Sequence, residues 1–360
     1  MASLDSSYSY KMQELAKINE RIRDLLNELP SFCSDYLYQK TASNKFQPRT
    51  KLSYLGDILT FFKWLHTSHE LFMDTPIKAY SMEQMKLITT ADITAFLASM
   101  DFYESESGIH TNSAASKSRK LAAIRSLFSF FVSNKGFTYN VASYVETPRI
   151  KTKDIVYMST EQQGAFLENV NAGKRITNSG AVMKYEDTSP YYLRDRAIIA
   201  LFLGTGIRIS ELVGIDVVDL DFRDSSVHIV RKGGNEQKVF FSSDVEDAIL
   251  SYLDYGREIL LKGNDDESAL FLSQRSGRIA VRSVQEIVSR YTEYTFGSDS
   301  KTKISPHKLR STYASNLLEE TDNIYLVANA LGHSDLSTVQ KYAKIKDMQR
   351  AAISLRSKDK

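Results

Sequence analysis

The composition of this 360-residue chain is that of an ordinary globular protein, with 42% hydrophobic and 25% charged residues. The length suits two domains. The chain has no apolar run of about 18 residues, so we predict no membrane span, and the single Cys33 excludes an internal disulfide. A formal net charge of +2 is small for a nucleic-acid-binding protein, so any surface that binds a polyanion must come from local clusters of basic residues.

The first 145 residues predict helices throughout. Between residues 8 and 29, apolar side chains recur at spacings of three and four, which is typical of an amphipathic helix, and Pro30 ends it. Its apolar stripe fits packing against its own domain, and contact with a second protomer is the alternative. Residues 31–145 contain two further patterns with one apolar face each, TKLSYLGDILTFFKWLH (50–66) and SKSRKLAAIRSLFSFFVS (116–133).

Basic residues gather at two places in this half. The side of 116–133 opposite its apolar face carries Lys117 and Lys120, with Arg119 nearby. Such a charged face is either a solvated surface or a contact for phosphate groups. Residues 146–158 predict a linker, because Pro148 favours extended backbone around it. The basic residues of this linker are Arg149, Lys151 and Lys153.

The second half predicts helices around a small antiparallel sheet. Ser159 and Gln162 fit a capping box at a helix start, whereas residues 171–189 lack periodicity and predict a surface loop. Two alternating segments flank Gly233–Gly234–Asn235, which indicates a hairpin. The predicted strands are 225–231, 238–241 and, as a candidate third strand, 269–273. The predicted helices are 193–203, 282–294, 307–319, 323–331, 337–343 and a small one in the tail from Met348.

Six residues with the chemistry of phosphoryl transfer follow one another in short motifs. They are Arg208 in TGIRISEL, Lys232 in RKGGN, His307 and Arg310 in HKLR, His333 in LGHSD, and Tyr342 in QKYAKI. Two arginines can clamp one phosphodiester, lysine and histidine can transfer protons, and tyrosine can attack phosphorus covalently. Such a set can break and rejoin a DNA strand without water, metal or ATP.

Each of these residues also has a structural alternative. Arg208 could form an ion pair with Glu211, and Lys232 could be an exposed turn residue. The local competitors for the lysine are Lys238 and, more weakly, Arg231. His307 and His333 could cap helices, although His307 and Arg310 are one helical turn apart and share a face.

The tyrosines and the remaining histidines can be compared for the same chemistry. A free tyrosine, with a pKa of about 10, is a poor nucleophile at neutral pH, but two arginines and a proton acceptor would favour the phenolate of Tyr342. The helical neighbours of Tyr313 and Tyr325 predict packing instead. His66 and His69 lack a nearby cysteine or carboxylate set, so they predict a polar helix end and we expect no metal site.

These motifs, in this order, resemble the tyrosine recombinase (phage integrase) family over roughly residues 30 to 350. The resemblance is strongest in TGIRISEL (205–212), SPHKLRSTYASNLLE (305–319) and ALGHSDLSTVQKYAKI (330–345). One departure is Ser311, where the family often has histidine, which puts the local geometry of a supporting position in question. The motifs are specific because several must occur in a fixed order.

The resemblance implies a mainly α fold with a small antiparallel sheet: a helical, SAM-like core-binding domain and an α+β catalytic domain. It implies Arg208 and Arg310 as phosphate clamp, Lys232 as general acid, His307 and His333 as supporting groups, and Tyr342 as nucleophile, with no cofactor. The implied DNA contacts are Lys117, Arg119, Lys120, Arg149, Lys151 and Lys153. The expected divisions are 1–30 (N-terminal helix), 31–145 (core-binding domain), 146–158 (linker), 159–345 (catalytic domain) and 346–360 (tail that contacts another protomer).

The implied partners are double-stranded DNA with specific recombination sites, a homo-tetramer on two duplexes and an accessory directionality factor, without a membrane. The N-terminus lacks an apolar signal core, so we expect a cytoplasmic protein, and the resemblance implies a bacterial, nucleoid-associated one. Integration or excision of a mobile element is the favoured function. The alternatives are a chromosome-dimer resolvase, a type IB topoisomerase-like enzyme and a non-catalytic DNA-binding regulator.

Overall fold

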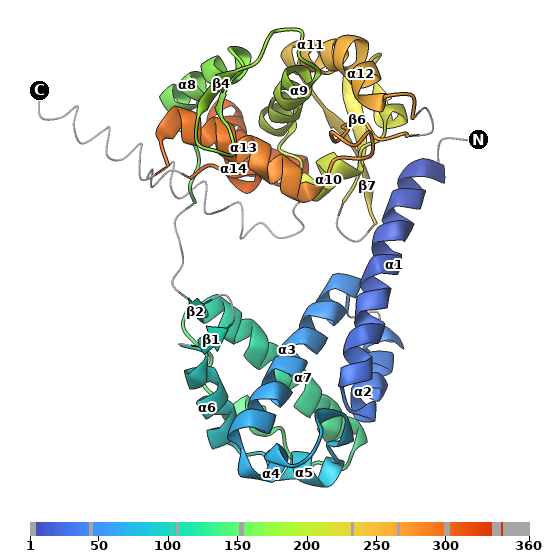
Figure 1. Cartoon of the computed structure of the whole chain (residues 1–360), viewed down its shortest axis with the longest axis vertical. Helices are drawn as coiled ribbons and strands as arrows, with labels where there is room; N and C mark the ends of the chain where they lie inside the picture. The colour runs from blue at the N-terminus through green and yellow to red at the C-terminus, as the bar shows by residue number, and fades with distance from the viewer. Residues whose placement is uncertain are drawn as a thin grey trace, which may run out of the picture. The chain divides into compact units, whose positions relative to one another are not determined.

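The computed structural model describes residues 5–42, 46–101, 103–105, 108–150, 155–231, 234–264, 267–298, 303–332 and 340. They fall into two compact units, which we call the helical unit (Lys11–Lys153) and the C-terminal unit (Met1–Tyr10 with Asp154–Lys360). The fold class is the predicted one, mainly α-helical with small antiparallel sheets (Figure 1). The five segments expected from the sequence remain predictions.

The helical unit is built from helices of very different length (Figure 1). Its helices are α1 (Asp5–Glu28, which begins in the C-terminal unit), α2 (Ser31–Ala42), α3 (Pro48–Ser68), α4 (Glu70–Met73), η1 (Ile77–Ala79), α5 (Met82–Lys86), α6 (Thr90–Ser99), α7 (Ala114–Asn134) and η2 (Val141–Tyr144). A short antiparallel hairpin joins α6 to α7, with strands β1 (Tyr103–Ser105) and β2 (Gly108–His110).

The two long helices α3 and α7 carry the core of this unit, as their sequence patterns predict. The apolar positions of both patterns are buried, and aromatic rings link the helices to α2: Phe32 lies edge-on to Phe62 of α3 at 6.2 Å and to Phe131 of α7 at 5.2 Å between ring centroids. Edge-to-face pairs of this kind add to the free energy of apolar burial. The prediction that residues 31–145 are entirely helical is wrong at β1 and β2, whose three-residue strands are too short for an alternating pattern to be recognised.

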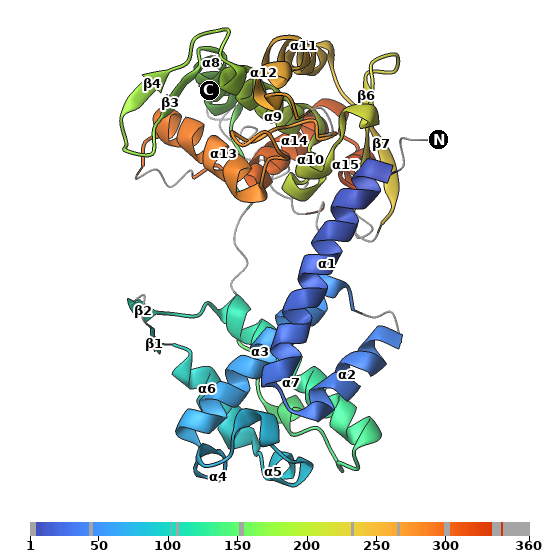
Figure 2. The same cartoon turned by 45° about the vertical axis from the view of Figure 1, so that its right-hand side comes forward.

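The C-terminal unit surrounds a buried helix with further helices and two small sheets (Figure 2). Its helices are α8 (Thr160–Asn171), α9 (Pro190–Thr205), α10 (Ile209–Gly214), η3 (Val217–Asp219), α11 (Ser243–Tyr252), the π-helical turn η4 (Leu253–Arg257), α12 (Glu258–Leu261), α13 (Val281–Phe296), α14 (Pro306–Thr321) and α15 (Ile324–Leu331). Its strands are β3 (Lys174–Ile176), β4 (Val182–Lys184), β5 (Leu220–Asp221), β6 (Ser226–Val230) and β7 (Glu236–Phe240).

Helix α9 is the centre of this unit because it is buried on nearly every side. It starts with Pro190 at its first turn, where the missing N–H costs nothing, and packs against α11, α14 and η4. The predicted capping box at Ser159 is present: its hydroxyl accepts from the N–H of Gln162, and the Gln162 side chain accepts from the N–H of Ser159. The predicted hairpin is also confirmed as β6 and β7, paired antiparallel.

Two sequence predictions for this unit are wrong. Residues 171–189 are more than a surface loop, because β3 and β4 pair there and β3 packs on α13. Residues 269–273 make only isolated bridges, and the third strand of the β6–β7 sheet is the two-residue β5. Strands of two or three residues are below the length at which alternation can be read. The helices α11 and α12 were not predicted.

The turn from α9 to α10 requires glycine at position 206. Gly206 has φ +62°, and a Cβ at this position would lie 2.3 Å from the ring of Tyr313 on α14. Gly263 also has a positive φ, +80°, but a Cβ there would meet nothing within 4 Å. Substitution of Gly263 therefore introduces backbone strain alone, whereas substitution of Gly206 introduces backbone strain and steric overlap.

We expect Gly206→Ala to lower the free energy of unfolding of the C-terminal unit more than Gly263→Ala. Both lose about 1–2 kcal/mol from a left-handed non-glycine residue, but Gly206→Ala adds about 1–3 kcal/mol from overpacking against Tyr313. Chemical denaturation of both variants checks this. Equal losses would contradict the steric argument.

Candidate active site

Arg208 lies at the start of α10, just after the Gly206 turn. Its backbone N–H donates to Glu211 Oε2 at 2.7 Å, and its guanidinium Nη1 donates to Glu211 Oε1 at 2.7 Å. The structural alternative, an ion pair with Glu211, is therefore present. About a third of the Arg208 side chain remains exposed, whereas Glu211 is buried, so the carboxylate orients a guanidinium that a ligand can still reach.

Arg310 is held by two backbone carbonyls from elements far apart in the sequence. It lies on α14 and is almost fully buried. Its Nη1 donates to the carbonyl of Gly206, and its Nη2 donates to the carbonyl of Leu331 at the end of α15, both at 2.5 Å. Because Gly206 is two residues before Arg208, these bonds tie the second arginine to the turn that carries the first.

His307 completes a cluster of three predicted site residues. It lies one turn before Arg310 on α14, and its side chain is exposed. Partial desolvation by the surrounding protein lowers the pKa of His307, and the positive charges of Arg310 and Arg208 lower it further. The structure therefore brings Arg208, His307 and Arg310 to one place. Ser311, the departure from the family pattern, is buried and donates to the carbonyl of His307 at 3.1 Å.

Two further residues belong to this cluster and were not singled out as functional. Glu211 accepts from Arg208 and also from Nη1 of Arg231 at 3.1 Å. Arg231 directly follows β6 and is buried, although the sequence indicated only a weak competitor for an exposed lysine position. The SEL of TGIRISEL could have pointed to Glu211, but an arginine next to a glycine-rich turn carries no sequence signal of burial.

Lys232, His333 and Tyr342 lie outside the described residues. The residues just before two of them are placed. Arg231 and Asn235 are joined by a backbone bond of 2.7 Å across the β6–β7 turn, and Gly332, with φ +60°, caps the end of α15. The local competitor Lys238 pairs instead with Asp221 and Asp224.

The competing tyrosines have different surroundings. Tyr313 is half-buried against the Gly206 turn, so the packing prediction for it is confirmed. The packing prediction for Tyr325 is wrong, because its side chain is 70% exposed. It lies in the first turn of α15, where the helix faces away from the core.

The predicted DNA contacts of the helical unit are mostly engaged in ion pairs. Lys117 pairs with Asp101, while Arg119 and Lys120 both pair with the buried carboxylate of Asp57. The prediction that Lys120 lies on an exposed face is wrong: it is buried because α3 supplies Asp57 beneath it.

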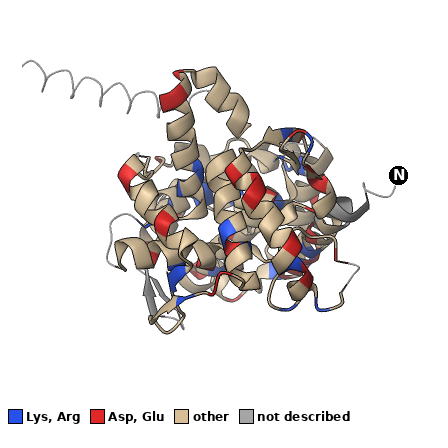
Figure 3. Ribbon diagram, turned by 90° about the horizontal axis from the view of Figure 1, so that it is seen from above, with Lys and Arg blue, Asp and Glu red and all other residues tan. Residues whose placement is uncertain are grey.

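Arg119 and Arg149 are exposed, and Lys151 and Lys153 lie outside the described residues. In the view of Figure 3, basic and acidic residues are interspersed.

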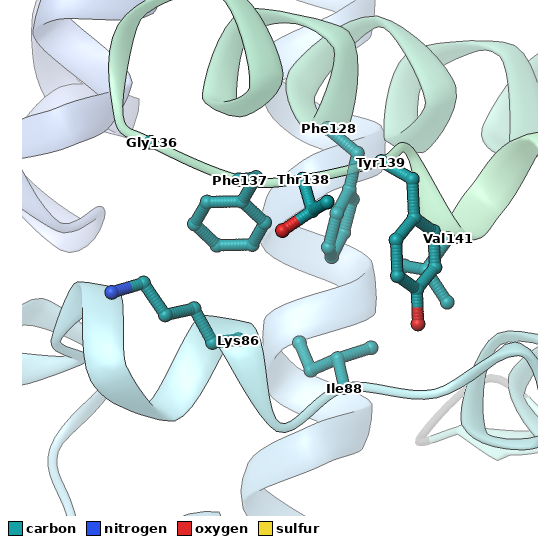
Figure 4. A pocket seen from close by; sticks show the side chains of 8 residues that line it. All are labelled: Lys86, Ile88, Phe128, Gly136, Phe137, Thr138, Tyr139 and Val141. Carbon is teal, nitrogen blue, oxygen red and sulfur yellow. The ribbon is translucent and has the colours of Figure 1, made fainter.

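Metal and small-molecule sites find little support in the described residues. No group of three or more histidine, cysteine, aspartate or glutamate side chains that could hold a metal occurs among them. His66 accepts or donates at the carbonyl of Phe72, and His69 caps α4, as expected of a polar helix end. A small pocket of about 190 Å³ lies in the helical unit between Lys86 and Phe137 (Figure 4), and no predicted site residue lines it. No described helix is long and apolar enough to cross a membrane.

The chain is similar to known proteins in family, sequence and structure. The model of the phage integrase family matches residues 177–349. Tyrosine recombinase XerC of Caldanaerobacter subterraneus is 27% identical over 326 residues, which cover 89% of this chain and 84% of the relative. XerC of Vibrio cholerae is 30% identical over 239 residues, which cover 66% of this chain and 70% of the relative.

Solved structures with the same fold include three recombinases. The XerH site-specific recombinase in a post-cleavage complex with its palindromic difH substrate matches with TM-score 0.64 and 18% identity, over 94% of each chain. The Tn1549 transposon integrase with circular intermediate DNA matches with TM-score 0.59 and 17% identity, over 87% of this chain and 95% of that one. A λ integrase tetramer on a Holliday junction matches with TM-score 0.58 and 14% identity, over 86% and 76%.

The sequence relatives identify the class of protein as the DNA strand transferases. The chain belongs to the phage integrase family, the tyrosine recombinases, and it is a site-specific tyrosine recombinase.

We expect the pKa of His307 to lie below its ordinary value of 6.5, and replacement of Arg208 by glutamine to raise it, because a positive charge that disfavours the imidazolium is removed. The titration of His307 followed by NMR checks this. Arg278→Gln, which removes a buried arginine that does not act on His307, is the matched control. An unchanged titration in Arg208→Gln would contradict the proximity of the two groups.

The lowered pKa of His307 also makes the free energy of unfolding depend on pH. The pKa of His307 is higher in the unfolded chain than in the folded protein, so the unfolded chain binds the proton first as the pH falls. This histidine therefore lowers the stability of the fold as the pH decreases from about 6.5 through its folded pKa.

Proposed function

We propose that this recombinase cuts and rejoins DNA through a 3′-phosphotyrosine on Tyr342. The observation that carries the proposal is the convergence of Arg208, His307 and Arg310, three groups suited to one scissile phosphate. The guanidiniums come from different helices and are both oriented by the protein, one by Glu211 and one by two carbonyls. Such preorganised positive charge stabilises the negative charge that develops on phosphate oxygens in the transition state.

In the proposed step, the phenolic oxygen of Tyr342 forms a bond to phosphorus while the bond from phosphorus to the 5′-oxygen breaks. The phenolic proton passes to a base. We assign this role to His307, whose lowered pKa leaves it mainly unprotonated at neutral pH. Lys232 gives a proton to the leaving 5′-oxygen, and His333 donates a supporting hydrogen bond. A 5′-hydroxyl from a partner duplex then reverses these events, so the bond energy is kept and no nucleotide cofactor or metal is needed.

The proposed substrate is double-stranded DNA with specific sites, held by a tetramer that exchanges strands in pairs through a Holliday junction. The similarity in fold to a λ integrase tetramer on such a junction and to XerH with its site supports this. We assign the DNA contacts to Lys117, Arg119, Arg149, Lys151 and Lys153, and leave out Lys120 because it is buried against Asp57. Phosphate contacts of this kind position a protein and do not read the sequence.

The proposed biological role is integration or excision of a mobile element in a bacterial cell, in the cytoplasm at the nucleoid and with an accessory directionality factor. The Tn1549 integrase supports a mobile element, and the XerC relatives support the second candidate, a chromosome-dimer resolvase. Comparing recombination of sites from the flanks of the gene with recombination of sites from the chromosomal terminus separates the two.

The first test is whether purified protein forms an adduct with labelled DNA from the flanks of its gene that survives SDS. We expect an adduct with the wild type and with Tyr325→Phe, and none with Tyr342→Phe, because only the last lacks the attacking oxygen. Tyr325 is a demanding control since it is exposed and lies near in sequence. An adduct with Tyr342→Phe would place the nucleophile elsewhere, and tight binding without any adduct would favour a regulator.

Deletion of residues 346–360 tests the tetramer. We expect site binding to persist while the synaptic complex of two duplexes is lost, because this tail is proposed to pack on a neighbouring protomer. Gel mobility and light scattering distinguish single-site from two-site complexes. Relaxation of a plasmid without any site by the wild type would instead indicate a topoisomerase-like enzyme.

A further inference from the structure

Arg231 makes contacts that no solvent-exposed turn residue would make. Its side chain is 5% exposed and its three kinds of nitrogen each have a different partner. Nε donates to Gln237 Oε1 at 2.8 Å, Nη1 to Glu211 Oε2 at 3.1 Å, and Nη2 to the carbonyl of Ala330 at 2.7 Å. One guanidinium therefore joins β7, α10 and the end of α15.

The end of α15 is fitted closely around this side chain. A Cβ at Gly332 would lie 2.8 Å from Nε of Arg231, so only glycine allows the chain to pass there. Gln237 adds a second bridge, because its amide nitrogen donates to the carbonyl of Asn329 at 3.2 Å. The β6–β7 turn and the last turn of α15 are thus joined through two polar side chains.

Burying this charge has a cost that its partners offset. Desolvation lowers the pKa of Arg231, while the carboxylate of Glu211 opposes that shift. Glu211 is itself shared with Arg208, so two guanidiniums compete for one buried carboxylate. Breaking one partner from such a set leaves a buried charge without compensation and is strongly unfavourable.

The position of Arg231 in sequence gives these contacts a functional meaning. Arg231 immediately precedes Lys232 in the chain. Its acceptor Ala330, and Asn329, the acceptor of Gln237, lie in the last turn of α15, shortly before Gly332 and His333. With its donors directed to protein acceptors and its side chain buried, Arg231 is not placed to bind phosphate itself.

We propose that Arg231 is a positioning residue. By contacting Glu211, Gln237 and Ala330, it holds together the β6–β7 turn, whose sequence includes Lys232, and the end of α15, which precedes His333. Proton delivery to the leaving oxygen therefore depends on Arg231. This inference rests on the proposed role of Lys232 as general acid. A misplacement of about 1 Å at a reacting group can cost about a hundredfold in rate.

A substrate with sulfur in place of the bridging 5′-oxygen separates positioning of the acid from general stability. A thiolate leaves without protonation, so a defect in the general acid disappears with sulfur, whereas a defect in the phosphate clamp or in folding persists. Single-turnover cleavage of oxygen and sulfur substrates, on a site that the wild type cleaves, gives the ratio for each variant.

We expect Lys232→Ala to slow oxygen cleavage by about 10²–10⁴-fold and to regain most of the rate with sulfur. Arg231→Met should slow oxygen cleavage by about ten- to a hundredfold and also regain its rate with sulfur. Gln237→Leu, which removes one bridge and keeps the buried charge pair, should show a smaller loss of the same kind. If Arg231→Met does not fold, the Gln237→Leu variant still tests the positioning role.

Arg278→Met is the matched control, because Arg278 is another nearly buried arginine with a carboxylate (Asp216) and carbonyl partners in the same unit. Any loss of rate in this variant should be equal for oxygen and sulfur. Equal losses for both substrates in Arg231→Met and Gln237→Leu, or no loss in either, would overturn the positioning role. If sulfur does not restore the rate of Lys232→Ala, the role of Lys232 as general acid is wrong. If the wild type does not cleave at all, the proposed function as a whole is wrong.

Discussion

The carboxylate of Glu211 is the interaction on which the rest of the site depends. It is the one acidic group among the described residues that contacts both Arg208 and Arg231, and it is almost fully buried. Without it, two guanidiniums at the start of α10 and the end of β6 would repel each other in a medium that screens charge poorly. With it, one arginine is left partly exposed for a ligand and the other is used internally.

The second arginine of the clamp is oriented by a different device. Two of the partners of Arg310 are backbone carbonyls, which orient the guanidinium without carrying a net charge themselves. Those carbonyls belong to the end of α9 and the end of α15, where Gly206 and Gly332 turn the chain with positive φ. The glycines are therefore part of the site, because they direct backbone oxygens at the side chain of Arg310 and hold its guanidinium in place.

The sequence predicted long elements and ordered motifs well, and failed where the signal is short or depends on a partner distant in the chain. The patterns around Leu55 and Phe131 were sufficient because a full helical face repeats over five turns. The strands β1, β3 and β5 have three residues or fewer and leave no period to detect. The clamp residues were found from their motifs, whereas the burial of Arg231 depends on Glu211 and Ala330, which lie 20 and 99 positions away.

The same dependence on distant partners limits how much basic surface a run of cations provides in a chain of net charge +2. On α7 the sequence shows three cations, Lys117, Arg119 and Lys120, but the fold brings Asp57 and Asp101 among them. Asp57 is buried, so it orients the exposed guanidinium of Arg119 from beneath and withdraws Lys120 from the surface. The cluster then keeps one net positive charge, with its most accessible donor already fixed in direction. A duplex approaching α7 would meet a preoriented arginine with little side-chain entropy left to lose, which favours specific geometry over general attraction.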